Sequence, residues 1–393
     1  MESGSVNNLV YFGHNRNDVA LIRRIRTFMD SELAVTGFTF RRDGESVESP
    51  VEWTNIDLGY VEHAKFGQRL LVLTKSLTRI LRHRAIIKQA DVIYARNLDI
   101  YLLAWFARML VPFKKPVMVY ECLDVHGSLT GSSQGARILR WLERRILDHC
   151  DLLIVSSPGF IKNYFDPVQQ YTGNCFLVEN KLHVDTAKIK RPKVSDITLT
   201  NNRPLKLVWP GILRCTKTLG LMKALAESMG DEIEIHFWGL ISGFLIADFE
   251  EQIEKTPNIV LHGQYAWPDE LEKVYRNTDL VWSQELSWRG YNSDWLLPNR
   301  IYEGSYFGVL SLAVEGTETA EYVKNEDIGY VLADANLETV ITFFRSLDKQ
   351  ELYEKRQRLI TMESEKFVVS EKDALELLLA ISMCREPSIK SCV

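Results

Sequence analysis

Short runs of β-branched and aromatic residues alternate with helical patterns along the chain, and this alternation restricts the fold more than any other feature. The first set of runs lies at 7–13, 90–96, 116–124, 151–157 and 175–180. The second set lies at 205–211, 232–239, 258–263, 279–284, 309–314 and 329–332. Strands that alternate with helices build a parallel sheet with crossover helices. The sequence therefore predicts an α/β fold with two such sheets.

The two sets of runs predict two domains. A chain of 393 residues is too long for one ordinary hydrophobic core. The polar stretch 181–204 has little apolar periodicity and is interpreted as the linker. We expect a Rossmann-like domain at 1–190, a second at 191–370, and a helix and tail at 371–393 that pack on the first domain. Doubly wound sheets bind ligands at the carboxyl ends of their strands, so the two sheets are expected to face each other across a cleft.

Charge is distributed unevenly between the two halves. The sequence has about 27 basic and 20 acidic residues up to position 195, and about 20 and 32 beyond it. This asymmetry predicts different partners for the two halves. No apolar run reaches the length of a membrane span, and the N-terminus lacks the pattern of a secretory signal. Six cysteines without CxxC spacing fit a reducing cytoplasm.

The loop after the first strand of the second set, WPGILRCTKTLG, predicts a diphosphate site. Gly211 is expected to end the strand, and Arg214 and Lys217 precede an apolar helix. A helix start presents unpaired backbone N–H groups and the positive end of the helix dipole, and a guanidinium and an ammonium would reinforce both. Two solvated basic residues on an ordinary loop are the alternative.

Two later segments predict the rest of a nucleotide site. Gln264 and Tyr265 follow a strand in LHGQY, where they could hold a flat base or form a routine connection to the next helix. Further on, PNRIYEG begins a helix that carries Glu303. A carboxylate there could accept hydrogen bonds from a ribose diol, or it could simply favour the helix dipole. The expected donor-binding residues also include Asn292, Asn299 and Arg300.

The first half carries candidates for proton chemistry where its strands end. GHNRND contributes His14, and ECLDVHG contributes Glu121, Asp124 and His126. A base must lie within hydrogen-bond reach of the hydroxyl that it activates, and Asp124 and His14 are the leading candidates for that role. Loop caps are the alternative for lone His and Asp residues at strand ends.

The order of the motifs Gly-x-x-Arg-x-x-Lys, LHGQY, PNRIYEGSYFG and AVEGTETAEYV resembles the C-terminal half of GT-B glycosyltransferases of the family 4 type. YFGHNRNDVALIRRIR, DVIYARNLD and VYECLDVHG are similar to the N-terminal half of the same group, in particular of enzymes in bacterial exopolysaccharide synthesis such as succinoglycan-type pathways. The resemblance implies a GT-B fold and hexosyl transfer from a UDP-sugar such as UDP-glucose to a saccharide or lipid-diphosphate-linked acceptor. It implies that Arg214 and Lys217 bind the diphosphate and that Glu303 binds the ribose.

One departure from the family pattern concerns its Glu-x7-Glu pair. Trp295 stands where the first acid would fall, and Asp294 is one residue out of register. The group that contacts the sugar hydroxyls, and the choice between retention and inversion, therefore stay open. Two other functions stay open as well: a sugar-nucleotide 2-epimerase of the same architecture, and a non-catalytic sugar-nucleotide sensor or scaffold.

The histidine and charge patterns argue against several other kinds of ligand. The sequence has no HxxxH pair and no short Asp-x-Asp motif, so neither a metal site nor a cofactor is expected. The basic residues lie in amphipathic helices without interleaved aromatic platforms, which argues against nucleic acid as a partner. The basic and apolar stretch 69–88, supported by 105–115, predicts either contact with an anionic membrane on its inner face or a solvated helix face.

Overall fold

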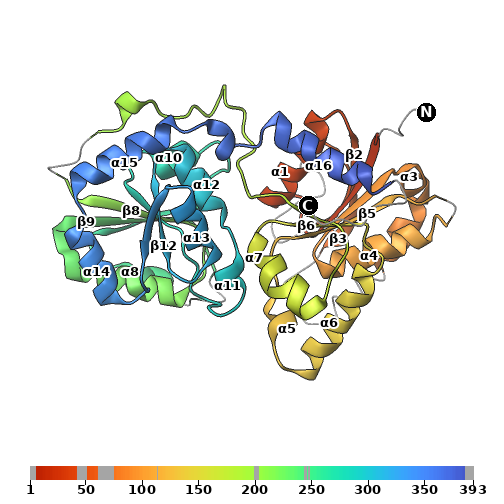
Figure 1. Cartoon of the computed structure of the whole chain (residues 1–393), viewed down its shortest axis with the longest axis horizontal. Helices are drawn as coiled ribbons and strands as arrows, with labels where there is room; N and C mark the ends of the chain where they lie inside the picture. The colour runs from red at the N-terminus through yellow and green to blue at the C-terminus, as the bar shows by residue number, and fades with distance from the viewer. Residues whose placement is uncertain are drawn as a thin grey trace. The chain divides into compact units, whose positions relative to one another are not determined.

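The computed structural model describes residues 6–41, 51–60, 75–112, 114–198, 203–242, 246 and 248–385. The chain divides into two compact units. The first comprises the chain up to Glu179 together with the residues from Ser370 onward, and the second runs from Asn180 to Val369. Each unit contains a parallel sheet with flanking helices (Figure 1). The predicted α/β fold with two Rossmann-like sheets is confirmed.

Seven strands form the parallel sheet of the first unit, in the order β3-β2-β1-β4-β5-β6-β7. The strands are β1 (Asn8–Gly13), β2 (Ala34–Arg41), β3 (Thr54–Tyr60), β4 (Val92–Arg96), β5 (Val117–Cys122), β6 (Leu152–Val155) and β7 (Cys175–Leu177). The sequence patterns located five of them and missed β2 and β3. β3 lies at the edge of the sheet and buries few of its residues, and its sequence, TNIDLGY, carries a weak apolar signal.

Helices cover both faces of the first sheet. They are α1 (Val19–Asp30), α3 (Arg84–Gln89), α4 (Leu98–Met109), α5 (Gly127–Thr130), α6 (Gln134–Leu147), α7 (Pro158–Phe160), the π-helix η1 (Ile161–Gln169) and α16 (Glu371–Met383). On one face, Ile25 of α1 and Leu377 and Ile381 of α16 share a core cluster with Tyr94 of β4. On the other face, α4, α6 and η1 all contact Tyr120 of β5. The last helix of the chain thus completes the core of the first unit.

Six strands form the parallel sheet of the second unit, in the order β10-β9-β8-β11-β12-β13. The strands are β8 (Leu205–Leu213), β9 (Ile233–Ile241), β10 (Ile259–Gly263), β11 (Leu280–Trp282), β12 (Leu310–Val314) and β13 (Gly329–Leu332). All six coincide with runs that the sequence predicted. Because every strand is parallel to its neighbours, their carboxyl ends lie along one edge of the sheet, where ligands bind in such folds.

The second unit also contains helices and 3₁₀ turns before, between and after its strands. They are α8 (Thr216–Met229), α9 (Phe249–Ile253), α10 (Leu271–Tyr275), α11 (Asn292–Trp295), α12 (Asn299–Tyr306), α13 (Glu318–Asn325), α14 (Leu337–Ser346) and α15 (Lys349–Thr361), with 3₁₀ turns η2 (Val194–Asp196), η3 (Gly230–Glu232) and η4 (Ser364–Lys366). α14 packs against α8, and α15 packs against α12 and β12.

The polar stretch 181–204 belongs to the second unit as far as it is described. Leu182 and Ile189 are buried in the core of that unit, and Leu182 forms a bridge with Val368. A few scattered apolar side chains hold this irregular segment in place. They have neither helical nor strand periodicity, and for that reason the sequence pattern alone indicated a linker.

Candidate active site

A pair of glycines lies in β8 and β9 near the carboxyl ends of these strands. β8 continues to Leu213, so Gly211 lies inside the strand and not at its end, as the sequence had suggested. Gly211 has a φ of +115° and pairs with Gly239 of β9. A Cβ atom at Gly239 would lie 1.8 Å from the Gly211 carbonyl oxygen. The close approach of these two strands therefore requires glycine at position 239.

Lys217 lies in the first turn of α8, and Arg214 lies just before the helix. Cys215 caps the helix, because its Sγ accepts a hydrogen bond from the Thr218 N–H at 3.4 Å. α8 has 14 residues, so its N-terminus carries the positive end of a long helix dipole. A cavity of about 550 Å³ opens beside it, lined by Lys217, Leu286, Arg289, Val314, Ala333, Asp334 and Ala335.

Glu285 is an acid that the sequence analysis did not single out. It follows β11 within three residues, at the carboxyl edge where ligand-binding side chains lie. Its side chain is 9% exposed, and its Oε2 lies 3.9 Å from the Arg214 Nε. Burial raises the pKa of Glu285, but the Arg300 guanidinium and hydrogen bonds from Ser287 outweigh burial and bring it below the usual value. Glu285 is therefore ionised at neutral pH and pairs with Arg214.

Arg300, the second residue of α12, joins three elements of this edge. Its Nη1 donates to the Pro210 carbonyl in β8 at 3.2 Å, and its Nε donates to the Ser283 carbonyl after β11 at 3.4 Å. Burial lowers the pKa of Arg300 from its ordinary value. The guanidinium thus fixes the start of α12 against the ends of two strands.

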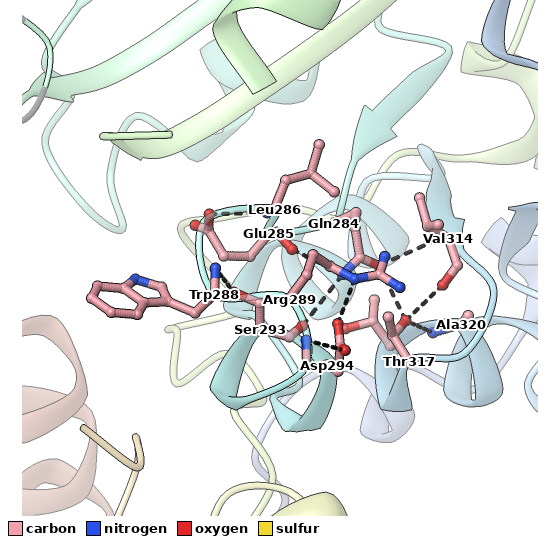
Figure 2. Close-up of polar contacts among 12 residues, drawn as sticks. Gln284, Glu285, Leu286, Trp288, Arg289, Ser293, Asp294, Val314, Thr317 and Ala320 are labelled. Atoms are coloured by element: carbon pink, nitrogen blue, oxygen red, sulfur yellow. Dashed lines mark hydrogen bonds and ion pairs between the residues drawn. The ribbon is translucent and has the colours of Figure 1, made fainter. Parts of the chain in front are cut away.

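Gln284 is a buried hub for the loop that follows β11 (Figure 2). Its Nε2 donates to the carbonyls of Glu285 and Ser293 at 3.1 and 3.3 Å. Its Oε1 accepts from the Val314 N–H at 3.2 Å and from the Thr317 hydroxyl at 3.1 Å. One amide therefore holds both ends of the loop 285–293 against the end of β12 and the start of α13.

Asp294, the acid one residue out of the family register, is engaged within its own loop. Its Oδ1 lies 2.6 Å from the Arg289 Nε, and its Oδ2 accepts from the Gly290 N–H at 2.6 Å (Figure 2). The Arg289 Nη2 also reaches the Glu315 carbonyl at 3.5 Å. Asp294 thus positions Arg289 on the cavity wall. Sequence reasoning missed Arg289, although WRG follows the end of a strand closely.

Glu303 lies in the middle of α12 and is 5% exposed. Its Oε1 accepts a hydrogen bond from the Trp267 Nε1 at 3.1 Å, and its Oε2 accepts from the Tyr275 hydroxyl at 2.9 Å. These two donors come from the segment between β10 and β11, so they join α12 to the loop that contains Gln264 and Tyr265. The carboxylate is held rigidly, as the sequence argument required, but it is also part of the core.

The remaining predicted donor-binding residues lie at element ends. Gln264 is exposed directly after β10, and Tyr265 is half-buried with its ring centroid 6.3 Å from that of Trp238. Trp238 in turn stacks on His262 at 4.1 Å. Asn292 and Asn299 are the first residues of α11 and α12. The end of β10 therefore offers aromatic surface, as the prediction of a base-binding loop requires.

In the first unit, His14 is paired with a carboxylate that the sequence analysis did not name. The His14 Nε2 lies 2.7 Å from the Oδ2 of Asp99, which is in the first turn of α4. Asn97, just before that helix, has a φ of 62° and a ψ of 161°, a conformation that costs a non-glycine residue about 1–3 kcal/mol. A strained backbone persists only where the surrounding contacts hold it in place. These contacts therefore fix the position of the first turn of α4 beside His14.

Glu121 is buried inside β5 and only 1% exposed. Its Oε1 accepts from the Arg24 Nε at 2.9 Å, its Oε2 accepts from the Tyr11 hydroxyl at 3.2 Å, and the Arg96 Nε lies 3.8 Å away. Arg96 also pairs with Asp18, the N-cap of α1, at 2.8 Å. Glu121 therefore neutralises buried arginines under the carboxyl edge of the sheet.

Asp124 and His126 follow β5 and are both exposed. The His126 Nδ1 accepts a hydrogen bond from the Ser128 N–H at 3.2 Å and thereby caps α5. His126 thus has the loop-cap contact that was the alternative to a catalytic role. Among the described residues, no group of three or more His, Cys, Asp or Glu side chains is placed to hold a metal ion, and none of the helices in these ranges is long and apolar enough to cross a membrane.

Solved structures match nearly the whole chain. Sucrose-phosphate synthase from Thermosynechococcus elongatus has a TM-score of 0.69 and 14% identity, with 97% of this chain and 100% of that one covered. HepE from Anabaena, solved with UDP and glucose, has a TM-score of 0.66 and 14% identity over 96% and 100%. A glycosyltransferase from Rickettsia africae has a TM-score of 0.64 and 13% identity over 98% and 100%. At this identity the likeness establishes the GT-B fold.

Sequence comparison establishes the family. No protein-family model matches the chain. The succinoglycan biosynthesis protein ExoL of Rhizobium meliloti strain 1021 is 31% identical over 335 residues, which cover 85% of this chain and 83% of that protein. The expected resemblance to exopolysaccharide enzymes is confirmed, and the chain belongs to the ExoL-like family of GT-B glycosyltransferases.

Proposed function

We propose that this glycosyltransferase moves a hexosyl group from a UDP-sugar, such as UDP-glucose, to a lipid-linked saccharide in exopolysaccharide synthesis. The observation that carries the proposal is the pair of cations at the start of α8, Arg214 and Lys217, on the sheet edge that also carries α12 with Glu303. ExoL, whose name places it in succinoglycan biosynthesis, and HepE, solved with UDP-glucose, support the choice of pathway and donor.

The donor diphosphate is assigned to Arg214, Lys217 and the N-terminus of α8. Backbone N–H groups, the helix dipole and two cations together neutralise a diphosphate as it leaves, and each charge-assisted hydrogen bond contributes about 1.5–3 kcal/mol. The pairing of Arg214 with Glu285 holds the guanidinium in place before the donor arrives. Glu303 receives the ribose hydroxyls, and Gln264 and Tyr265 receive the base. The same donor site is completed by Gly211, Asn292, Asn299 and Arg300.

The acceptor is assigned to the first unit. Asp124 and His14 are proposed to contact the acceptor hydroxyl, with His126 beside them. Asp124 accepts its proton if the anomeric configuration inverts. If the configuration is retained, the leaving diphosphate accepts that proton and these side chains orient the acceptor. The burial of Glu121 between Arg24 and Tyr11 assigns it a structural role instead.

The acceptor lipid implies contact with the cytoplasmic face of a membrane. The first half of the sequence carries an excess of basic residues, as binding to anionic lipid requires. Of the stretch 69–88, residues 69–74 lie outside the described residues. In the described part Ile80 and Ile87 are buried, and Leu81 is 44% exposed.

Binding and transfer assays on the full chain test this function. Titration calorimetry with UDP and UDP-glucose should give saturable binding, and radiolabelled glucose should move from UDP-glucose to a lipid-diphosphate-linked saccharide. Asp124→Asn should lower the transfer rate while the UDP-glucose Kd stays within about twofold, because Asp124 is assigned to the acceptor side. Absence of UDP binding would refute the donor site. Release of an epimerised UDP-sugar without acceptor would favour the epimerase instead.

A further inference from the structure

The inner side of helix α6 packs against the core of the first unit. Glu143 is 1% exposed and accepts hydrogen bonds from the Tyr120 hydroxyl at 2.8 Å and the Gln169 Nε2 at 2.6 Å, and it also contacts the Tyr164 hydroxyl. Two arginines of the helix also donate hydrogen bonds to backbone carbonyls of neighbouring segments. Arg140 reaches Leu129 and Gly131 at 2.7 and 2.8 Å, and Arg144 reaches Val168 and Gln169 at 2.6 and 3.1 Å. These contacts fix the helix on the unit.

The outer side of α6 presents large apolar groups to solvent. Ile138 is 65% exposed and Trp141 is 56% exposed. The guanidinium carbon of Arg145 lies 5.8 Å from the centroid of the Trp141 ring. Arg137 is exposed as well, and the spacing of these four residues places them on one side of a helix. We call this set, Arg137, Ile138, Trp141 and Arg145, the outer face of α6.

Charge on the outer face is complementary to an anionic surface. Within 134–147 the only acid is Glu143, and its side chain points into the core. Asp148, just past the helix, lies 3.7 Å from Arg145, but both side chains are more than half exposed, so this pair is weak and can give way to a lipid phosphate. Tryptophan and arginine beside an exposed aliphatic residue are typical of helices that lie in the membrane interface.

A second exposed apolar stripe shows that apolar exposure by itself does not define such a face. Leu375 and Leu379 of α16 are 58% and 53% exposed. Their helix carries Glu371, Asp373 and Glu376. Acidic side chains are repelled by anionic lipid, so α16 has the apolar residues without the complementary charge.

We propose that the outer face of α6 docks the enzyme on anionic lipid bilayers. Ile138 and Trp141 enter the interface, and Arg137 and Arg145 bind lipid phosphates. The chain reaches α6 from β5 through the segment that contains Asp124, His126 and α5. Docking through α6 therefore holds the proposed acceptor side of the first unit at the membrane, where a lipid-linked saccharide is found. The benefit of docking for sugar transfer rests on the proposed function, because it requires a lipid-linked acceptor. The binding of α6 to lipid does not rest on that function.

Sedimentation with large unilamellar vesicles tests the docking. The full chain is mixed with vesicles of phosphatidylcholine alone or with about 30 mol% phosphatidylglycerol, so that the two preparations differ in anionic lipid. Wild type should bind the anionic vesicles and lose most of that binding in high salt. Arg137→Gln with Arg145→Gln should weaken binding about 25-fold, from about fivefold for each charge. Ile138→Ala with Trp141→Ala should weaken it about tenfold or more.

The matched control truncates two exposed apolar side chains on another helix of the same unit. Leu375→Ala with Leu379→Ala should leave vesicle binding within about twofold. Brominated lipids should quench tryptophan fluorescence in wild type more than in Trp141→Phe, because Trp141 is the residue inserted. The far-ultraviolet circular dichroism spectrum and the urea unfolding midpoint of every variant should equal those of wild type, which confirms that the first unit is folded.

Three outcomes would overturn the docking proposal. In the first, the wild-type protein does not bind the anionic vesicles. In the second, both α6 double variants bind them as tightly as wild type does. In the third, the α16 double variant loses as much vesicle binding as the α6 variants lose. Failure of the chain to bind UDP would refute the donor site while leaving a positive vesicle result intact, so the two proposals fail separately.

Discussion

Glu303 has two roles that a pair of substitutions can separate. It is 5% exposed and accepts hydrogen bonds from the Trp267 Nε1 and the Tyr275 hydroxyl. Glu303→Ala leaves the buried Tyr275 hydroxyl and the half-buried Trp267 Nε1 without that acceptor, and each such loss costs about 1–3 kcal/mol. We therefore expect the free energy of unfolding to fall by about 2–6 kcal/mol. Glu303→Gln keeps one carbonyl oxygen, and the loss should be about half as large.

The ribose assignment makes a different prediction for UDP affinity. Replacing the carboxylate by a neutral amide removes the charge from its hydrogen bonds to the ribose, which is expected to cost about 1.5–3 kcal/mol of binding. The UDP Kd of Glu303→Gln should therefore rise about 10- to 150-fold. Titration calorimetry with UDP gives the Kd, and urea unfolding gives the stability of the same protein.

Tyr275→Phe is the matched control for this experiment. It removes one donor to Glu303 and keeps the carboxylate, so stability should fall by about 1 kcal/mol while the UDP Kd changes little. An unchanged UDP Kd in Glu303→Gln would refute the ribose assignment, and Glu303 would then be a core residue only.

Three further predictions concern charges elsewhere in the molecule. Arg214→Ala and Lys217→Ala should each raise the UDP Kd about tenfold or more but leave uridine binding unchanged; an equal loss for uridine would show that the diphosphate is not their ligand. Glu143→Ala should lower the free energy of unfolding by at least about 3 kcal/mol, because three buried groups lose their acceptor, and a loss below about 1 kcal/mol in urea unfolding would contradict the packing argument. For Asp18, burial raises the pKa, but Arg96 and the backbone N–H groups of α1 outweigh burial and lower it to about 2. Because this folded pKa is below the unfolded value of about 3.9, the stabilisation is present above about pH 4 and lost as the pH falls toward 2. The difference in Tm between wild type and Asp18→Asn should shrink over that range, and a constant difference would refute the pairing with Arg96.

The strand patterns by themselves determined most of the architecture. All six strands of the second sheet and five strands of the first were readable, because buried parallel strands are short apolar runs bounded by turns. β3 escaped because it lies at the edge of its sheet and buries few of its side chains. β2 pairs with strands on both sides and is largely buried, but its sequence, AVTGFTFR, mixes threonine and glycine with the apolar residues. A pattern that counts apolar residues detects such mixed sequences poorly.

The placement of Arg214, Lys217 and Glu303 near one sheet edge also followed from the sequence, because a parallel sheet brings the loops after its strands together. The partners of these side chains did not follow. Glu285 pairs with Arg214, Trp267 and Tyr275 donate to Glu303, and Arg24 pairs with Glu121. Such contacts join residues tens of positions apart, and the packing of whole elements decides them. Local sequence reports which face of an element is apolar, whereas only the folded chain decides whether a given acid meets an arginine, a tyrosine or solvent.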